Sequence, residues 1–418
     1  MRILHVIHRF PPAIGGSESW CAGVARWQAK HGHEVTVHTL RAVEEDQLWN
    51  RAYGPGPVAV GGADSQGGVC VRRCAVETPG TAVQKLLHWR GLWPWTGALS
   101  AEFCGLLVRL AAANDVIHAH TVPLAHNYLA WLAARLARRP FVLTPHFHVG
   151  HPDHEGRAVR WLLRRADRVL VDTESERAAL SARGVARGRL VVVANAIDLA
   201  PWEEVPGRES VRAALGVSHG APLLSFVGRK AATKGIDVLF AALSLLRHRP
   251  APVLALAGPS TSWYRSLHPP SGAIRVIDLP VLPERAKTDL LAASDLFVLP
   301  SRHEAFGIVF LEAWAAGAPV LGADVPAVRE VIGEAGTTFR PNDPVDLAAK
   351  IDAALADPAE ARRQVARGRQ RIAGAHTWDH VGPTVEAVYE DLLARRRRGG
   401  LARGSEPRDS QERVAAGR

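Results

Sequence analysis

The order of apolar and polar residues predicts alternating strands and helices from the start of the chain. Residues 2–7 predict a buried strand, residues 17–30 place apolar side chains at helical spacing, and residues 34–40 predict a second strand. Gly15 and Gly16 fall in the loop between the first strand and the helix. Because this loop lacks side chains at two successive positions, a phosphate can approach its backbone closely, and it is a candidate anion site.

The alternation continues along the chain. In the first half, further strands are predicted at 115–121, 141–146, 168–172 and 190–194, and helices at 124–138 and 159–167. In the second half, strands are predicted at 223–229, 252–258, 274–280 and 295–299, and helices at 236–247, 284–293 and 383–394. Residues 51–82 are rich in glycine and show no regular period. Such alternation is typical of α/β proteins with parallel sheets.

The length of 418 residues is long for one domain and sufficient for two. We place an N-terminal domain at residues 1–200 and a second domain at residues 201–378. Residues 379–394 are expected to form a final helix. The arginine-rich residues 395–418 offer almost nothing apolar to bury, so we expect them to be disordered.

The segment 298–320 holds two glutamates, Glu304 and Glu312, eight residues apart. Gly307 stands where a loop turns into a helix that begins at Ile308. The free N–H groups and the positive dipole end of this helix would lie beside Glu304, which suits a ligand with both hydroxyls and phosphates. Two solvated glutamates at a strand–helix corner are the alternative interpretation.

Two cations follow the first predicted strand of the second half. Arg229 lies at the strand end, and Lys234 precedes Gly235 and the next helix. A guanidinium forks onto phosphate oxygens and an ammonium adds a second charge, so the pair suits a diphosphate. A solvated surface pair is the alternative. The chain lacks the G-x-G-x-x-G of dinucleotide enzymes, which argues against an NAD-binding protein.

Histidines gather at the ends of predicted strands. His118 and His120 end one strand, and His146 ends the next. In open parallel sheets the carboxyl ends of the strands face the ligand crevice, so these are candidate site residues. Four more residues with metal-binding side chains follow closely: His148, His151, Asp153 and His154. Their spacing fits no common metal site, so we expect structural or acceptor-side roles for them and no metal.

Composition narrows the class of protein. The net charge is +10, but no recognition element interleaves basic and aromatic residues, so we expect no nucleic-acid partner. The four cysteines are too few and too scattered for a disulfide framework, which predicts free thiols in a reducing cytosol. No signal peptide and no apolar run of about 18 residues is present, so we expect a cytoplasmic protein.

Residues 85–95 suggest a membrane partner. They combine Trp89, Trp93 and Trp95 with the cations Lys85 and Arg90. Tryptophan beside basic residues suits an anionic membrane interface, which would make the protein peripheral at the inner face of a membrane. A helix start packed on the core, with surface charges, is the alternative.

Five motifs together resemble the retaining glycosyltransferases of family 4, which have the GT-B fold. They are PPAIGG at 11–16, the T-x-H that ends at His146, ANAIDL at 194–199, G-R-x4-K-G at 228–235, and the E-x7-E of Glu304 and Glu312. Ala196 replaces a usual glycine, and Pro326-Ala327 stands where glycines are common before Glu330. The resemblance covers nearly all of residues 1–394. It implies two Rossmann-like domains facing a cleft, with the last helix crossing back onto the first domain.

The resemblance also implies roles for individual residues. Arg229, Lys234, the amides of Gly15 and Gly16 and the helix start near Ile308 would neutralise a departing diphosphate. Glu304 would hold the sugar hydroxyls, aided by the amides of Phe306 and Gly307, and Glu312 would hold the ribose. His146 would lie against the transferred sugar.

The implied reaction is transfer of a sugar, with retention, from a nucleoside-diphosphate sugar to an acceptor hydroxyl. The acceptor would be a glycolipid, a cell-envelope polysaccharide or another glycoconjugate precursor, lipid-linked acceptors included. No D-x-D motif ends a strand, so no divalent ion or other cofactor is expected to be required. An epimerase or phosphorylase of the same fold, and an inactive binding protein, stay open as alternatives.

Overall fold

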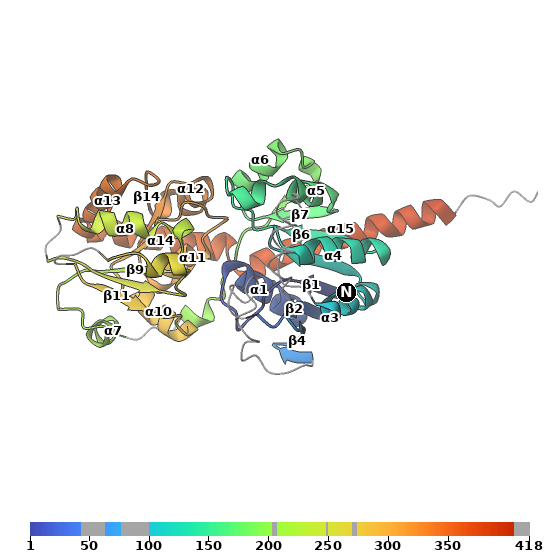
Figure 1. The fold of residues 1–418 in the computed structure, drawn as a ribbon, viewed down its shortest axis with the longest axis horizontal. Helices are drawn as coiled ribbons and strands as arrows, with labels where there is room; N and C mark the ends of the chain where they lie inside the picture. Colours follow the sequence, from blue (N-terminus) through green and yellow to red (C-terminus); the bar gives the residue numbers. More distant parts are fainter. Residues whose placement is uncertain (43–62, 77–99, 203–206, 248–249, 270–273, 405–418) are drawn as a thin grey trace, which may run out of the picture.

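The computed structural model describes residues 1–42, 63–76, 100–202, 207–247, 250–269 and 274–404. These residues form two α/β domains that meet near residue 200, and the last helix passes back along the first domain (Figure 1). The predicted fold class of two parallel-sheet domains with a returning helix is confirmed.

The first domain contains an eight-stranded sheet in the order β3-β4-β2-β1-β5-β6-β7-β8. The strands are β1 Arg2–Val6, β2 Glu34–Leu40, β3 Ala63–Gln66, β4 Val69–Cys74, β5 Val116–His120, β6 Phe141–Thr144, β7 Arg168–Val171 and β8 Leu190–Val192. All neighbouring strands are parallel except β3, which is antiparallel to β4. The edge strand β3 and its neighbour β4 were not predicted, because their glycine-rich surroundings hide the apolar alternation.

Helices cover both faces of this sheet. They are α1 Gly16–Lys30, α3 Ala101–Ala113, α4 Ala125–Leu136, α5 Arg157–Arg165 and α6 Glu174–Ala182, with the short 3-10 helices η3 Pro152–Glu155 and η4 Arg187–Arg189. On one face, Leu107, Ala133 and Leu162 pack α3, α4 and α5 into a single apolar cluster. On the other face, Trp20 of α1 packs with Tyr389 of the returning helix. The sheet is therefore buried on both sides, as parallel sheets require.

The second domain contains a six-stranded parallel sheet in the order β11-β10-β9-β12-β13-β14. The strands are β9 Leu223–Val227, β10 Val253–Ala257, β11 Val276–Leu279, β12 Leu296–Leu299, β13 Val320–Ala323 and β14 Thr337–Phe339. The helices are α7 Arg208–Ala214, α8 Ile236–Leu243, α9 Ser262–Arg265, α10 Glu284–Ala293, α11 Ile308–Ala316, α12 Pro326–Ile332, α13 Pro344–Ala356 and α14 Pro358–Ala375, with η5 Ala200–Trp202, η6 Ala232–Lys234 and η7 Gly333–Ala335.

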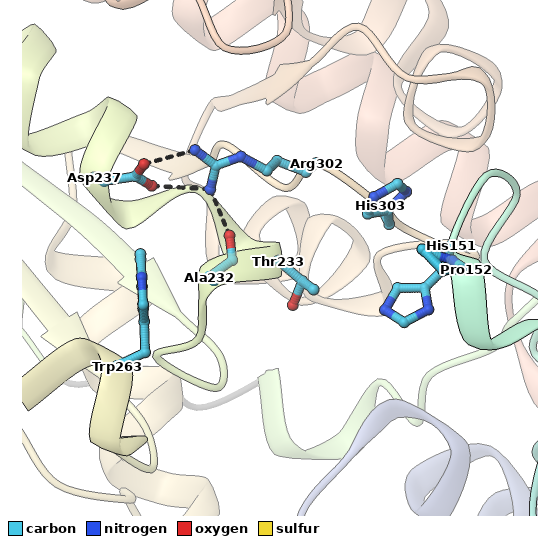
Figure 2. A pocket seen from close by; sticks show the side chains of 8 residues that line it. All are labelled: His151, Pro152, Ala232, Thr233, Asp237, Trp263, Arg302 and His303. Atoms are coloured by element: carbon cyan, nitrogen blue, oxygen red, sulfur yellow. Dashed lines mark hydrogen bonds and ion pairs between the residues drawn. The ribbon is translucent and has the colours of Figure 1, made fainter. Parts of the chain in front are cut away.

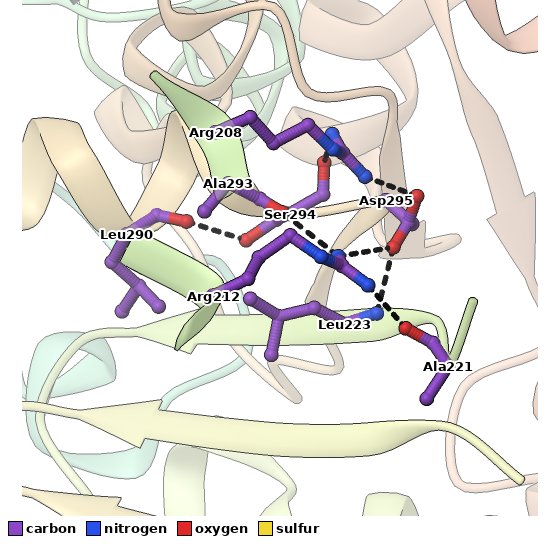
Figure 3. A network of polar contacts seen from close by, with 8 residues as sticks. All are labelled: Arg208, Arg212, Ala221, Leu223, Leu290, Ala293, Ser294 and Asp295. Carbon is purple, nitrogen blue, oxygen red and sulfur yellow. Dashed lines mark hydrogen bonds and ion pairs between the residues drawn. The ribbon is translucent and has the colours of Figure 1, made fainter. Parts of the chain in front are cut away.

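A polar network fixes the entry helix α7 to this sheet (Figure 3). The carboxylate of Asp295 accepts hydrogen bonds from the backbone N–H of Leu223 at 2.7 Å and from the Arg212 guanidinium at 2.9 Å. Arg208 contributes a second guanidinium to the same carboxylate. The start of β9 is thereby held at a fixed position beside the start of β12.

The last helix, α15, runs from Trp378 to Gly404 and packs against α1. The contact is close, because a Cβ at Gly23 would lie 1.9 Å from the Trp378 ring. Two predictions need correction. The helix begins at residue 378 rather than 383, and residues 395–404, which we expected to be disordered, are helical. Residues 405–418 and the tryptophan-rich segment 85–95 lie outside the described residues.

Candidate functional site

A buried carboxylate shapes the glycine loop of the first domain. Helix α1 begins at Gly16, and a Cβ at the preceding Gly15 would lie only 2.2 Å from Oε2 of Glu18, so a side chain there would displace this carboxylate. The guanidinium of Arg9 lies 2.6 Å from Oε1 of Glu18. Burial raises the pKa of Glu18, but the positive charges around it, Arg9 foremost, outweigh that effect and lower it to about 2. The loop is therefore held by an ionised pair.

The start of α11 faces this loop from the second domain. A Cβ at Gly16 would lie 4.0 Å from Cγ2 of Ile308, the first residue of α11. Gly307 has a left-handed backbone with φ of 86°, and a Cβ there would lie 2.7 Å from the Phe310 ring. Phe306 is buried, with its ring 5.6 Å from that of His376. The glycine loop and the start of α11 thus lie next to each other.

Lys234 and Glu304 form an ion pair between two loops of the second domain. Nζ of Lys234 lies 2.6 Å from Oε2 of Glu304, and Ser301 donates to the same oxygen at 3.1 Å. Gly235 has φ of 67°, and a Cβ there would lie 2.1 Å from the carbonyl oxygen of Pro300. Only glycine allows the two loops to approach so closely, and this approach brings the lysine to the glutamate.

Arg229 lies just beyond the end of β9, where charges from both domains meet. Burial lowers the pKa of its guanidinium, and the nearby Arg9 lowers it further. Glu18 and Glu304 act in the opposite direction. Arg9, Arg229 and Lys234 thus bring three cations close to the carboxylates of Glu18 and Glu304, and cations gathered where the two domains meet suit an anionic ligand.

Glu312 lies on α11 and forms a buried ion pair with Lys287 of α10. Nζ of Lys287 lies 2.7 Å from Glu312 and 2.9 Å from Glu284, and it stands 5.9 Å from the centroid of the Trp202 ring. Burial raises the pKa of Glu312, and Lys287 opposes this rise. Because Glu304 and Glu312 are both paired and mostly buried, the alternative of two solvated glutamates is wrong.

His146 lies at the end of β6 in a left-handed conformation with φ of 47°. Its Nδ1 lies 3.1 Å from Oδ2 of Asp172, whereas its buried Nε2 has no hydrogen-bond partner among the described residues. Trp20 presents an edge to the His146 ring at 5.9 Å. A carboxylate on one nitrogen fixes the ring and leaves the other nitrogen free for a ligand hydroxyl.

Family comparisons match both halves of the chain. The model described as "glycosyl transferase 4-like domain" matches residues 15–196, and that described as "glycosyl transferases group 1" matches residues 207–371. A D-inositol 3-phosphate glycosyltransferase of Kineococcus radiotolerans is 31% identical over 437 aligned positions, which cover 94% of each chain. The chain belongs to glycosyltransferase family 4. This glycosyltransferase is also 29% identical to a glycogen synthase of Mycobacterium tuberculosis, over 95% of both chains.

Solved structures agree on the fold. The Anabaena protein HepE, solved with UDP and glucose, superposes with a TM-score of 0.72 at 20% identity, covering 94% of this glycosyltransferase and 100% of HepE. A sucrose-phosphate synthase from Thermosynechococcus elongatus gives 0.70 at 20% identity, with coverages of 94% and 100%. The glycosyltransferase therefore has the GT-B fold.

A pocket of about 370 Å³ opens between the two domains of the glycosyltransferase (Figure 2). His151 of the first domain faces His303 of the second, with 5.4 Å between the ring centroids. The guanidinium nitrogens of Arg302 donate hydrogen bonds to the carboxylate oxygens of Asp237 at 2.6 and 2.9 Å. Arg302 therefore lines the pocket as part of an ion pair. Because Thr233, which also lines the pocket, and His303 adjoin Lys234 and Glu304 in the chain, the pocket is next to the ion pair.

The histidines at the end of β5 pack inside the first domain. His118 is fully buried, and its two ring nitrogens bond to Tyr389 at 2.6 Å and to Thr144 at 2.7 Å. Nδ1 of His5 lies 2.9 Å from Nε2 of His120. The nitrogens of His5, His118 and His120 are close enough to hold a metal ion, but five of these six atoms are engaged in hydrogen bonds within the protein. The arrangement is that of a packed polar network.

Four residues at the site were not singled out from the sequence, namely Arg9, Glu18, Asp172 and Lys287. Arg9 and Glu18 flank the glycine loop, and Asp172 ends a predicted strand at the ligand edge of the sheet, so position alone pointed to these three. Lys287 gave no signal, because its partner lies 25 residues away on another helix.

Proposed function

We propose that this glycosyltransferase transfers a sugar from a nucleoside diphosphate to an acceptor hydroxyl with retention of anomeric configuration. The observation that carries the proposal is the Lys234–Glu304 pair, which stands beside Arg229 near the glycine loop and the start of α11. Two structural neighbours support the choice of donor, since HepE was solved with UDP and with UDP-glucose.

Sugar transfer from a nucleoside diphosphate depends mainly on stabilisation of the leaving diphosphate. In the proposal Arg229 and Lys234 balance its charge, and the backbone amides of Gly15, Gly16 and Ile308 donate hydrogen bonds to its oxygens. Such preorganised donors lower the barrier because they meet the charge that develops as the glycosidic bond breaks. We propose that these cations suffice without a divalent ion.

The sugar and the ribose engage different carboxylates in the proposal. Glu304 releases part of its contact with Lys234 and accepts hydrogen bonds from sugar hydroxyls, supported by the amides of Phe306 and Gly307. Glu312, oriented by Lys287, accepts hydrogen bonds from the ribose diol. The free Nε2 of His146 accepts a hydrogen bond from the sugar that is transferred.

The acceptor is proposed to be a hydroxyl of a glycolipid, a cell-envelope polysaccharide or another glycoconjugate precursor. Relatives that align over almost the whole chain have different names, D-inositol 3-phosphate glycosyltransferase and glycogen synthase. Homology therefore does not identify the acceptor. The pocket beside His151 and His303 gives an acceptor room next to the donor.

A panel of UDP-, GDP- and ADP-sugars tests the proposal by thermal shift. A donor at 100 times its dissociation constant adds about 2.7 kcal/mol to the free energy of unfolding. We expect one donor to stabilise the protein and the Lys234→Ala variant to show a much smaller shift. Sugar release that requires inorganic phosphate would favour a phosphorylase, and absence of any donor-dependent shift would favour an inactive binding protein.

A further inference from the structure

The outward faces of α3, α4 and α5 carry large apolar side chains that no described element covers. We call this surface the helical face. Its exposed apolar side chains are Val108 at 49%, Leu132 at 45%, Leu136 at 66% and Trp161 at 40% of their full accessibility. The three helices are neighbours, because α3 packs on α4 and the ring of Trp161 on α5 lies 4.8 Å from that of Trp131 on α4. The exposed side chains therefore belong to one surface.

The charges on the same three helices are almost all positive. They contain six arginines, Arg109, Arg135, Arg157, Arg160, Arg164 and Arg165. Their single acidic residue is Glu102, in the first turn of α3. The guanidinium of Arg165 lies over the Trp161 ring at 5.6 Å, so a cation and an exposed aromatic side chain lie together on α5. The helical face thus combines exposed apolar side chains with an excess of positive charge.

The basic surface continues onto the end of α15. A hollow of about 1250 Å³ lies where α15 passes the beginnings of β7 and β8. Its lining includes two aspartates, Asp115 and Asp167, and seven arginines: Arg138, Arg139, Arg168, Arg189, Arg395, Arg396 and Arg397. Arg139 pairs with Asp115, and Arg168 and Arg395 pair with Asp391, so the arginines outnumber the acidic groups near them. Burial lowers the pKa of Arg396, with Arg135 and Arg139 adding to the effect and Asp167 opposing it. The end of α15 and the end of α4 are therefore close enough for their arginines to repel each other, which favours an anionic partner for both.

We propose that the helical face, together with the arginines of α15, docks the enzyme on the surface of an anionic lipid bilayer. Acidic headgroups neutralise the arginines, and Leu132, Leu136 and Trp161 enter the interfacial region, where aliphatic and amphipathic aromatic side chains are both stable. A nucleic acid would gain nothing from exposed leucines. A second copy of the same nearly acid-free face would be repelled. This inference goes beyond the proposed function and does not depend on it.

The test is vesicle flotation with the full-length protein. We expect binding to vesicles of 70% phosphatidylcholine and 30% phosphatidylglycerol, weaker binding as salt rises, and none to phosphatidylcholine alone. The basic variant is Arg135→Glu/Arg165→Glu. Each arginine near an anionic surface contributes roughly fivefold to binding, so this variant should lose at least about 25-fold. The apolar variant, Leu132→Ser/Leu136→Ser, should lose at least about fivefold.

The matched control is Arg362→Glu/Arg371→Glu, which makes the same charge change at exposed positions of α14 in the second domain. It should keep most of the vesicle binding. Undiminished vesicle binding in the basic variant would overturn the proposal. Two other results would also overturn it. One is full vesicle binding by the apolar variant together with tight binding of a 30-base-pair DNA duplex. The other is a wild-type dimer in sedimentation that the apolar variant no longer forms. Donor-induced thermal shifts, measured without vesicles, should be unchanged in all variants and thus separate this inference from the proposed function.

Discussion

The ammonium group of Lys234 and the carboxylate of Glu304 form an ion pair with 2.6 Å between Nζ and Oε2. The two residues are 70 positions apart in the chain and meet because Gly235 packs against the carbonyl of Pro300. A nucleotide sugar has phosphate oxygens and sugar hydroxyls within a few bonds of each other. Under the proposed function the donor separates this ion pair: Lys234 then contacts the phosphate oxygens of the donor, and Glu304 contacts its sugar hydroxyls.

Removing a cation should slow the reaction without unfolding the protein. We expect Lys234→Ala and Arg229→Ala each to lower turnover by at least about 100-fold, which is the usual effect of losing one group that stabilises developing charge. Steady-state kinetics and a melting curve measure the two effects. Lys350→Ala on α13 is the control and should be neutral. Near-normal turnover in a folded variant would remove that residue from the mechanism.

Substitution of Glu304 and of Glu312 should change different kinetic constants. Glu304 is proposed to contact the sugar whose charge changes in the transition state, so Glu304→Gln should lower turnover by one to two orders of magnitude. Glu312 is proposed to hold the ribose, which is remote from the breaking bond, so Glu312→Gln should mainly raise the Michaelis constant of the donor. Kinetics at saturating acceptor decide between them. The reverse pattern would exchange the two roles.

The close approach at Gly235 should be required for folding as well as activity. Gly235→Ala combines a left-handed backbone with a Cβ 2.1 Å from the Pro300 oxygen, whereas Gly220→Ala has a similar φ of 80° and no atom within 4 Å. We expect Gly220→Ala to lower the free energy of unfolding by about 1 kcal/mol, and Gly235→Ala to lower it by at least about 2 kcal/mol more. Urea unfolding of both variants measures this difference. Equal losses of unfolding free energy in the two variants would show that the loop at Pro300 shifts to accept the added Cβ.

Acid should destabilise the first domain well above the pH at which carboxylates titrate. Burial lowers the pKa values of His5, His38 and His126 to about 4 each, against about 6.5 in an unfolded chain. Between these values the unfolded chain binds more protons than the folded one, so the free energy of unfolding falls as pH falls. The loss from pH 7.5 to pH 5 should be on the order of 2 kcal/mol for each histidine.

Chemical unfolding between pH 7.5 and pH 5 tests this expectation. His126→Gln, which keeps a side-chain donor for the carbonyl of His120, should flatten the pH dependence by about one proton. Stability that does not change over this range would contradict the assignment of these histidines as neutral when folded.

Elements with a clear apolar period were predictable. The helix after Gly307 was expected from Ile308 and is observed at Ile308–Ala316. Strands β3 and β4 were missed because their alternation is short and lies in a glycine-rich stretch, and because β4 joins the sheet through β2, which lies far away in the chain. Helix α6 was also missed, since only two residues, Glu176 and Leu180, mark its buried side.

The site was predictable as a set of motifs but not as a set of contacts. Arg229, Lys234, Glu304 and Glu312 stand at strand and helix ends, and that position identified them. Their ion-pair partners depend on how strands distant in sequence lie next to each other in the sheet. Helical spacing could not predict the Lys287–Glu312 pair, because it joins two different helices.

The anomeric configuration of the released or transferred sugar is the most direct test of the proposed retaining transfer. The stabilising donor, with its α-linked sugar, is incubated with the protein and the products are followed by proton NMR from the first minutes. We expect the α-anomer to form first, and Lys234→Ala to slow its formation by at least about 100-fold. First appearance of the β-anomer, or an unchanged rate in Lys234→Ala, would contradict it.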